Sequence, residues 1–310
     1  MPRTARRALR VRILFPALVA AATAALALSL GPGGPPPGSA ADRFVAGQLS
    51  TTRTPVVGAE AKVLRERAAT HRRAIGVSAA ATVTVERVVD RFAGLTVDEV
   101  VDRDNRGRPL ALQRFDPAGR LLAAVRFGGH NPKGTDVATA ARAEGAALRL
   151  ARALDLDPAG AARVRRGAAE EWIVEWPRVV DGIPVPGDGV VVRAWTDGSL
   201  HTAVRHERPL AEPPGRLIAV GQARRLAGAR LAGWLDARNA GEWRIDGAAL
   251  AWVAPNDTFE ASGPDAPAAT LRLAWVVRAT TRGALAGSIH GLELYLDAGD
   301  GRLLGGDVVR

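Results

Sequence analysis

Few residues of the sequence stand at spacings that would support catalysis. The five histidines are spread along the chain: His71, His130, His201, His206 and His290. The closest pair is His201 and His206, and a separation of five residues puts its members on opposite faces of a strand. No HExxH sequence occurs. We therefore expect no metal-binding residues.

Nucleophile and cofactor motifs are equally scarce. Ser288 and His290 lie only two residues apart in a glycine-rich stretch, which does not favour a nucleophile–base pair, and GxSxG, GxGxxG and Walker sequences are absent. The chain has no cysteine, which excludes disulfides and thiolate chemistry. We predict no catalytic or cofactor-binding residue and no cofactor. An enzyme of unknown type stays an alternative, and it would require distant residues such as His201, Asp197 and Glu207 to converge.

The acidic residues are better explained by structure than by acid–base chemistry. Two adjacent pairs, Asp98-Glu99 and Glu170-Glu171, point apart in a strand, so we expect them on solvated faces or strand edges. A second group near the C-terminus could contribute to a calcium loop, but it lacks the spacing of an EF-hand. Turn formation is the favoured role for its members, Asp297, Asp300 and Asp307.

Composition sets the broad class. The 310 residues, 47% hydrophobic and 24% charged, suit two or three small domains. The net charge of +10 is concentrated in part at the N-terminus, because five arginines and no acid occur in the first twelve residues. The rest of the chain has no basic run. We therefore expect no nucleic-acid partner.

The N-terminus predicts export. A basic start precedes residues 13–30, which carry no charge, and small residues follow at 39–41. Residues 1–30 are interpreted as a signal peptide or a transmembrane anchor, and residues 31–42 as a Pro/Gly-rich linker. Both interpretations, signal peptide and transmembrane anchor, stay open, because the uncharged stretch 13–30 is also close to the length of a membrane span. We expect an extracytoplasmic protein, either anchored by this single helix or secreted after cleavage near residues 40–41.

The remaining chain shows a repeated layout. Helix-period segments cover residues 58–75, 135–154 and 218–235, and strand-like runs follow each of them. Gly76 is placed to end the first helix. The predicted apolar stripe of the second helix is Val137, Ala141, Leu148, Ala151 and Leu154, and that of the third is Ala223, Leu226, Ala227, Leu231 and Trp234. The pattern predicts an α+β fold in which two or three tandem units each pack one helix on an antiparallel β-meander, a cystatin-like layer. The expected units are 43–132, 133–212 and 213–310. The first of these is the least clear, and whether it is a true third copy stays open.

Turn chemistry and tryptophans add detail to this layout. An Asp and a Gly stand between apolar runs at 115–125, 195–204 and 296–308, which predicts a hairpin at each position. Trp172 and Trp176 share one strand face. Such tryptophans could form an aromatic surface for a peptide or glycan, but core filling is favoured in units of this size.

The second and third units resemble PepSY-type domains. This family occurs in the pro-regions of thermolysin-like proteases and in YcdB/YcdC-like repeat proteins. The residues that carry the resemblance are WPR (176–178), DGIPV (181–185), GD (187–188) and DG (197–198), then LAWV (250–253), LAWVV (273–277), YLDA (295–298) and GRLL (301–304). No catalytic domain accompanies them.

The resemblance implies a non-catalytic extracytoplasmic protein-interaction module. Its role would be peptidase-inhibitor-like or regulatory, and its partner another envelope or secreted protein, such as a peptidase or a subunit of a membrane complex. Pairing of an edge strand with an extended partner segment is one mechanism that fits the strand pattern. A membrane-anchored accessory or sensor subunit of a signalling or secretion complex is the alternative, and it requires residues 13–30 to remain uncleaved. The oligomeric state stays open.

Overall fold

The computed structural model describes residues 51–78, 80–90, 95–130, 133, 137–167, 170–234, 242–256, 270–283, 286 and 289–309. These residues divide into two compact units, one ending at Pro209 and one spanning Leu210–Arg310. The predicted export or anchor segment 1–30 and the linker 31–42 lie outside the described residues. Within the described ranges, no helix combines the length and the apolar character needed to cross a bilayer.

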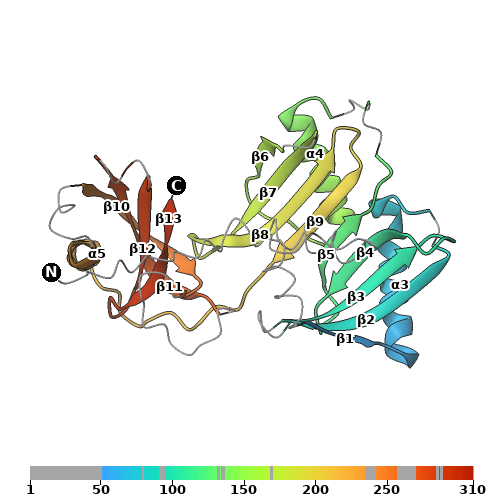
Figure 1. The fold of residues 1–310 in the computed structure, drawn as a ribbon, viewed down its shortest axis with the longest axis horizontal. Coiled ribbons are helices and arrows are strands. Elements are labelled where there is room, and N and C mark those ends of the chain that lie inside the picture. Colours follow the sequence, from blue (N-terminus) through green and yellow to red (C-terminus); the bar gives the residue numbers. More distant parts are fainter. Residues whose placement is uncertain are drawn as a thin grey trace, which may run out of the picture. The chain divides into compact units, whose positions relative to one another are not determined.

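The unit ending at Pro209 is built on one antiparallel sheet of nine strands (Figure 1). Their order is β1-β2-β3-β4-β5-β9-β8-β7-β6, so two runs of consecutive strands meet where β5 pairs with β9. The strands are β1 (Thr51–Pro55), β2 (Thr82–Asp90), β3 (Leu95–Arg103), β4 (Pro109–Phe115), β5 (Leu121–Arg126), β6 (Arg163–Arg166), β7 (Glu171–Val180), β8 (Ile183–Trp195) and β9 (Leu200–His206).

Two helices pack on this sheet, α3 (Gly58–Ile75) and α4 (Ala140–Ala153). The helix predicted over residues 58–75 is confirmed, and it ends at Gly76, whose φ of 84° suits a residue without a Cβ. The second helix begins later than the predicted residue 135, because Thr139 is its N-cap and accepts a hydrogen bond from the backbone of Arg142.

The core of this unit lies between the helices and the sheet. Fully buried members include Ala68 of α3, Ala147 of α4 and Phe115 of β4. Trp172 and Trp176 are buried in the same core, and the Trp172 indole donates a hydrogen bond of 2.7 Å to the carbonyl of Val137. The preference for core filling over a ligand surface is therefore confirmed for these two tryptophans.

The predicted apolar stripe of the second helix is only partly right. It comprised Val137, Ala141, Leu148, Ala151 and Leu154. The helix instead buries Ala143, Ala146, Ala147 and Ala151, while Ala141 is exposed. Alanine occurs on every side of this helix, so the pattern could not fix which side faces the core.

The three hairpins predicted from Asp-Gly turns are confirmed. They connect β4 to β5, β8 to β9, and β12 (Gly291–Asp297) to β13 (Leu303–Val309). In the first of them, a carboxylate oxygen of Asp116 accepts the backbone N–H of Arg120, and Gly119 adopts a φ of 76°. These are the roles that Asp and Gly take in tight turns.

The unit Leu210–Arg310 is a separate four-stranded antiparallel sheet in the order β10-β11-β12-β13. It adds β10 (Trp243–Val253), β11 (Arg272–Thr281) and one helix, α5 (Val220–Trp234). Ala223, Ala227 and Leu231 of the helix pack against the sheet, as predicted, but Trp234 is 36% exposed and does not belong to the buried stripe.

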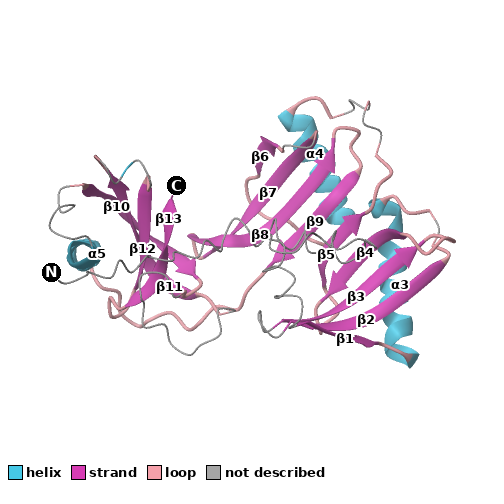
Figure 2. Ribbon diagram, viewed as in Figure 1, coloured by secondary structure: helices cyan, strands magenta, loops and turns pink. Residues whose placement is uncertain are grey.

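The predicted fold class is wrong. We expected an α+β chain of two or three tandem units, each with a helix on its own meander, but the described residues are mostly strands in two sheets of nine and four (Figure 2). Segments 43–132 and 133–212 contribute to one continuous sheet through the β5–β9 pairing. Local periodicity reveals strands, but not which open edges pair over long range.

The close approach of β7 and β8 at Gly189 yields a stability prediction. Gly189 has a φ of 130°, and a Cβ placed there would lie 2.1 Å from the Trp176 carbonyl oxygen. We expect Gly189→Ala to lower the free energy of unfolding by at least about 1 kcal/mol. Urea denaturation of the full chain measures this change.

Gly145→Ala is the matched control, because Gly145 lies in helix α4 and only the Arg149 side chain, at 3.7 Å, would approach the new methyl group. This substitution should raise the free energy of unfolding by up to about 1 kcal/mol. Equal changes in the free energy of unfolding for the two variants would contradict the conclusion that the close approach of β7 and β8 leaves no room for a side chain at Gly189.

Candidate functional site: an arginine-lined groove

Of the histidines considered as metal ligands or bases, one lies in the core and two stack on the same tryptophan. His71 is buried, with its Nδ1 atom 2.9 Å from the Gln113 side-chain oxygen. His130 and His201 both stack on Trp195, at ring-centroid distances of 4.0 and 4.3 Å. In the part of the chain that the structure describes, no group of three potential metal ligands occurs.

The residues whose convergence would have indicated an enzyme, His201, Asp197 and Glu207, each contact a different partner. His201 Nδ1 lies 2.6 Å from a carboxylate oxygen of Glu171. Asp197 accepts a hydrogen bond of 2.9 Å from the backbone of Ser199, within its own turn. Glu207 forms an ion pair of 3.3 Å with Arg120. Ser288 lies outside the described residues.

The adjacent acids Asp98 and Glu99 do point to opposite sides, but neither is solvated. Asp98 forms an ion pair of 2.9 Å with Arg87. Glu99 lies between Arg53, at 2.6 Å, and Arg114, at 2.9 Å, and its side chain is 0% exposed. The prediction of solvated faces is wrong here, because each side of the strand supplies its own guanidinium partner.

A similar correction applies to the second acidic pair. Glu170 is exposed, as predicted, but Glu171 is buried and contacts both His201 and Arg193. Buried carboxylates with cationic partners hold strands together, and removing one partner leaves an uncompensated charge. These acids therefore belong to the framework of the sheet.

Ion pairing also shifts the pKa of a framework arginine. Burial alone would lower the pKa of Arg53, but the charge of Glu99 and hydrogen bonds to Glu86 and Glu99 outweigh it, so the pKa is raised. The charged form of Arg53 is thus stabilised within the sheet.

The C-terminal acids divide between two roles. Asp297 accepts backbone hydrogen bonds from Gly299 and Asp300, which confirms turn formation for Asp297. Asp300 accepts a backbone hydrogen bond of 2.8 Å from Arg302 in the same turn. Asp307 instead lies in strand β13, where it accepts a hydrogen bond from the Tyr295 hydroxyl. Burial raises the pKa of Asp307, although the Tyr295 hydrogen bond opposes the shift.

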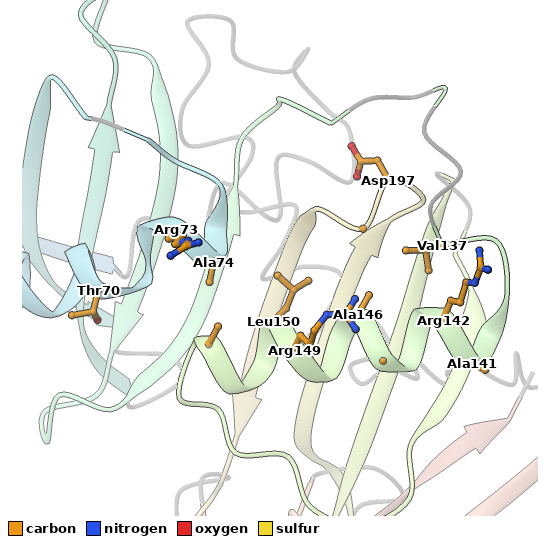
Figure 3. A pocket seen from close by; sticks show the side chains of 13 residues that line it. Thr70, Arg73, Ala74, Val137, Ala141, Arg142, Ala146, Arg149, Leu150 and Asp197 are labelled. Carbon is orange, nitrogen blue, oxygen red and sulfur yellow. The ribbon is translucent and has the colours of Figure 1, made fainter.

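One feature suited to binding is an open groove of about 1010 Å³ in the unit ending at Pro209. It runs between the C-terminal end of α3, the outer side of α4 and the turn between β8 and β9 (Figure 3). We call it the α3–α4 groove. Its lining residues are Thr70, Arg73, Ala74, Val137, Ala141, Arg142, Gly145, Ala146, Arg149, Leu150, Ala153, Asp197 and Gly198.

The sequence of α4 explains why the groove is open. The helix turns Ala143, Ala147 and Ala151 toward the sheet, and these residues are fully buried. Its groove-lining side therefore carries small residues such as Ala141 and Gly145, which leave space above the helix backbone. At the far side, Asp197 and Gly198 form the β8–β9 turn that borders the groove.

Three arginines supply the charge of the groove. Arg73 lies at the end of α3, and Arg142 and Arg149 lie on α4 (Figure 3). All three are exposed. Unlike the framework arginines, their guanidinium groups have no hydrogen bond or ion pair with any residue that the structure describes. The carboxylate of Asp197, the single acid in the lining, is engaged by Ser199. The groove thus carries a positive excess.

The lining chemistry suits the binding of an anion. It combines guanidinium groups, small aliphatic side chains and one carboxylate held within a turn. Arginine guanidinium groups recognise carboxylates and other oxyanions with paired N–H donors. The sequence analysis predicted none of the three arginines as part of a site. The available signal was two arginines seven positions apart on a helix in which seven of the 14 residues are alanine.

The comparisons with known proteins give no family. No family model matches the chain, and none of the curated proteins matches it. Among solved structures, the chain is similar to the C-terminal domain of YpeB from Bacillus megaterium, with 11% identity and a TM-score of 0.35. The alignment covers 83% of this chain and 100% of that one. A likeness of this size carries no function over, so the groove is interpreted from its own geometry.

The division between framework and groove arginines is testable by unfolding. We expect Arg114→Ala to lower the free energy of unfolding by about 2 kcal/mol, because it removes a charged hydrogen-bond partner of buried Glu99. Arg149→Ala should change it by less than about 0.5 kcal/mol, as is usual for an exposed, unpaired side chain. Equal losses for the two variants in urea denaturation would show that Arg149 also serves the fold.

Proposed function

We propose that the protein is a non-catalytic extracytoplasmic interaction module that binds another envelope or secreted protein in the α3–α4 groove. The observation that supports this is the set of three exposed arginines, Arg73, Arg142 and Arg149, around one concave surface. None of them has a partner among the described residues. Unpaired cations at a groove attract an anionic ligand from solution.

The groove is a better candidate than the edges of the same sheet. The edge strand β1 has five residues and ends in Pro55, which has no backbone N–H to donate. The other edge strand, β6, has only four residues, three of them arginine. Short, charged edges resist the addition of another strand. Strand addition, which the sequence suggested as a mechanism, is therefore disfavoured in this unit.

Two predictions from the sequence are retained in this proposal. Export through residues 1–30 would place the groove outside the cytoplasm, whether the segment is cleaved or kept as an anchor. The PepSY resemblance of residues 133–310 suggests that the protein, when bound to its partner, has a peptidase-inhibitor-like or envelope regulatory role. In both roles the protein acts by contact, and the groove supplies the contact surface.

Site-specific photocrosslinking tests the proposal. A photoreactive amino acid replaces Ala141, an exposed groove residue of α4, in the full chain expressed in its native host. The control carries it at Ala232, an exposed alanine of helix α5. We expect a discrete protein adduct from position 141 that disappears in the Arg142→Glu/Arg149→Glu background.

Two outcomes would contradict the proposal. One is an equal adduct from position 232, which would show unspecific contact. The other is an adduct from position 141 that the arginine substitutions do not reduce, which would separate binding from the groove charge.

A further inference from the structure

We infer that the α3–α4 groove recognises an extended, acidic peptide segment of its partner. This inference rests on the proposed function and specifies the chemistry of the ligand. It depends on the separation of the arginines, the small residues of the floor and the concave form of the groove.

The separation of the cations selects against a small anion. Arg142 and Arg149 are seven residues apart on one helix, which corresponds to about 10.5 Å along its axis. Arg73 lies on a different helix, near the C-terminal end of α3. A free phosphate or sulfate would require donors that converge on one point. Cations distributed along a groove instead match carboxylates distributed along a chain.

The dimensions of the floor suit an extended backbone. The lining of α4 runs from Ala141 to Ala153, which is about 18 Å at 1.5 Å per residue. An extended chain of about five residues covers the same length. Gly145 and Ala146 leave room for a close approach, and Leu150 offers an apolar contact. The occupant would therefore combine acidic side chains with small or apolar ones.

The concave form favours a peptide over a membrane surface. The arginines line a hollow that the C-terminal end of α3 and the Asp197-Gly198 turn also line (Figure 3). A bilayer is flat on this scale and would meet the borders first. A single extended chain can enter the hollow and meet the guanidinium groups along its length.

The charge-reversal variant needed for the test should remain folded. Arg142 is the third residue of α4 after its cap Thr139. Glutamate is favoured at this position, because it completes a capping box and lies near the positive end of the helix dipole. Arg149 is exposed in the same helix and has no hydrogen-bond or ion-pair partner among the described residues. Glutamate is a good helix former there as well.

The experiment titrates the purified full chain against a fluorescent peptide in which glutamate alternates with alanine, and measures its anisotropy. We expect the Arg142→Glu/Arg149→Glu variant to weaken binding at least about tenfold, since two attractive contacts become repulsive. The matched control is Arg65→Glu/Arg106→Glu, which changes the net charge equally at two exposed arginines outside the groove. It should weaken binding by less than about threefold, through the long-range field alone.

If the peptide binds, three outcomes would still overturn the inference. They are an equal loss in the control variant, tighter binding of a single-stranded oligonucleotide of equal charge, and tighter binding of vesicles that contain anionic phospholipid. Failure of the peptide to bind while the crosslink from position 141 persists would reject the acidic peptide and leave the proposed function standing. Loss of both would reject both.

Discussion

The candidate site depends on the pairing of β5 with β9. Three residue pairs join these strands: Ala123 with Val204, Ala124 with Ala203, and Val125 with Thr202. Ala124 and Ala203 are fully buried in the core between sheet and helices, so the joint carries only small side chains there. Because this pairing makes one sheet of two runs of strands, α3 and α4 come into contact on it. The α3–α4 groove lies beside this contact and is lined by the C-terminal end of α3 and by α4.

Arginine serves two purposes in this unit. Arg53, Arg87 and Arg114 neutralise buried or nearly buried carboxylates of β3, so their positions are fixed by the stability of the sheet. Arg73, Arg142 and Arg149 meet no acid among the described residues and remain exposed at the groove. An exposed guanidinium contributes little to folding. These groups are therefore available to a ligand without a cost to the fold.

Local features were predictable from the sequence, and long-range ones were not. Gly76 marked the end of α3, and the Asp-Gly pairs marked three hairpins, because both depend on neighbouring residues alone. The β5–β9 joint, the partners of Glu99 and the groove all depend on residues far apart in the chain. The side of α4 that faces the sheet was ambiguous because alanine carries little directional signal. Because arginines occur throughout the sequence, their positions did not indicate which of them lie at the groove.

Hydrogen exchange of the full chain with and without the glutamate–alanine peptide tests the central claim most directly. Exchange should slow in α4, at the C-terminal end of α3 and in the β8–β9 turn, because these segments line the groove. The exchange rates in the unit Leu210–Arg310 should not change when the peptide is added. Slower exchange in the edge strands β6 or β10, with α4 unaffected, would contradict the account and indicate recognition by strand addition.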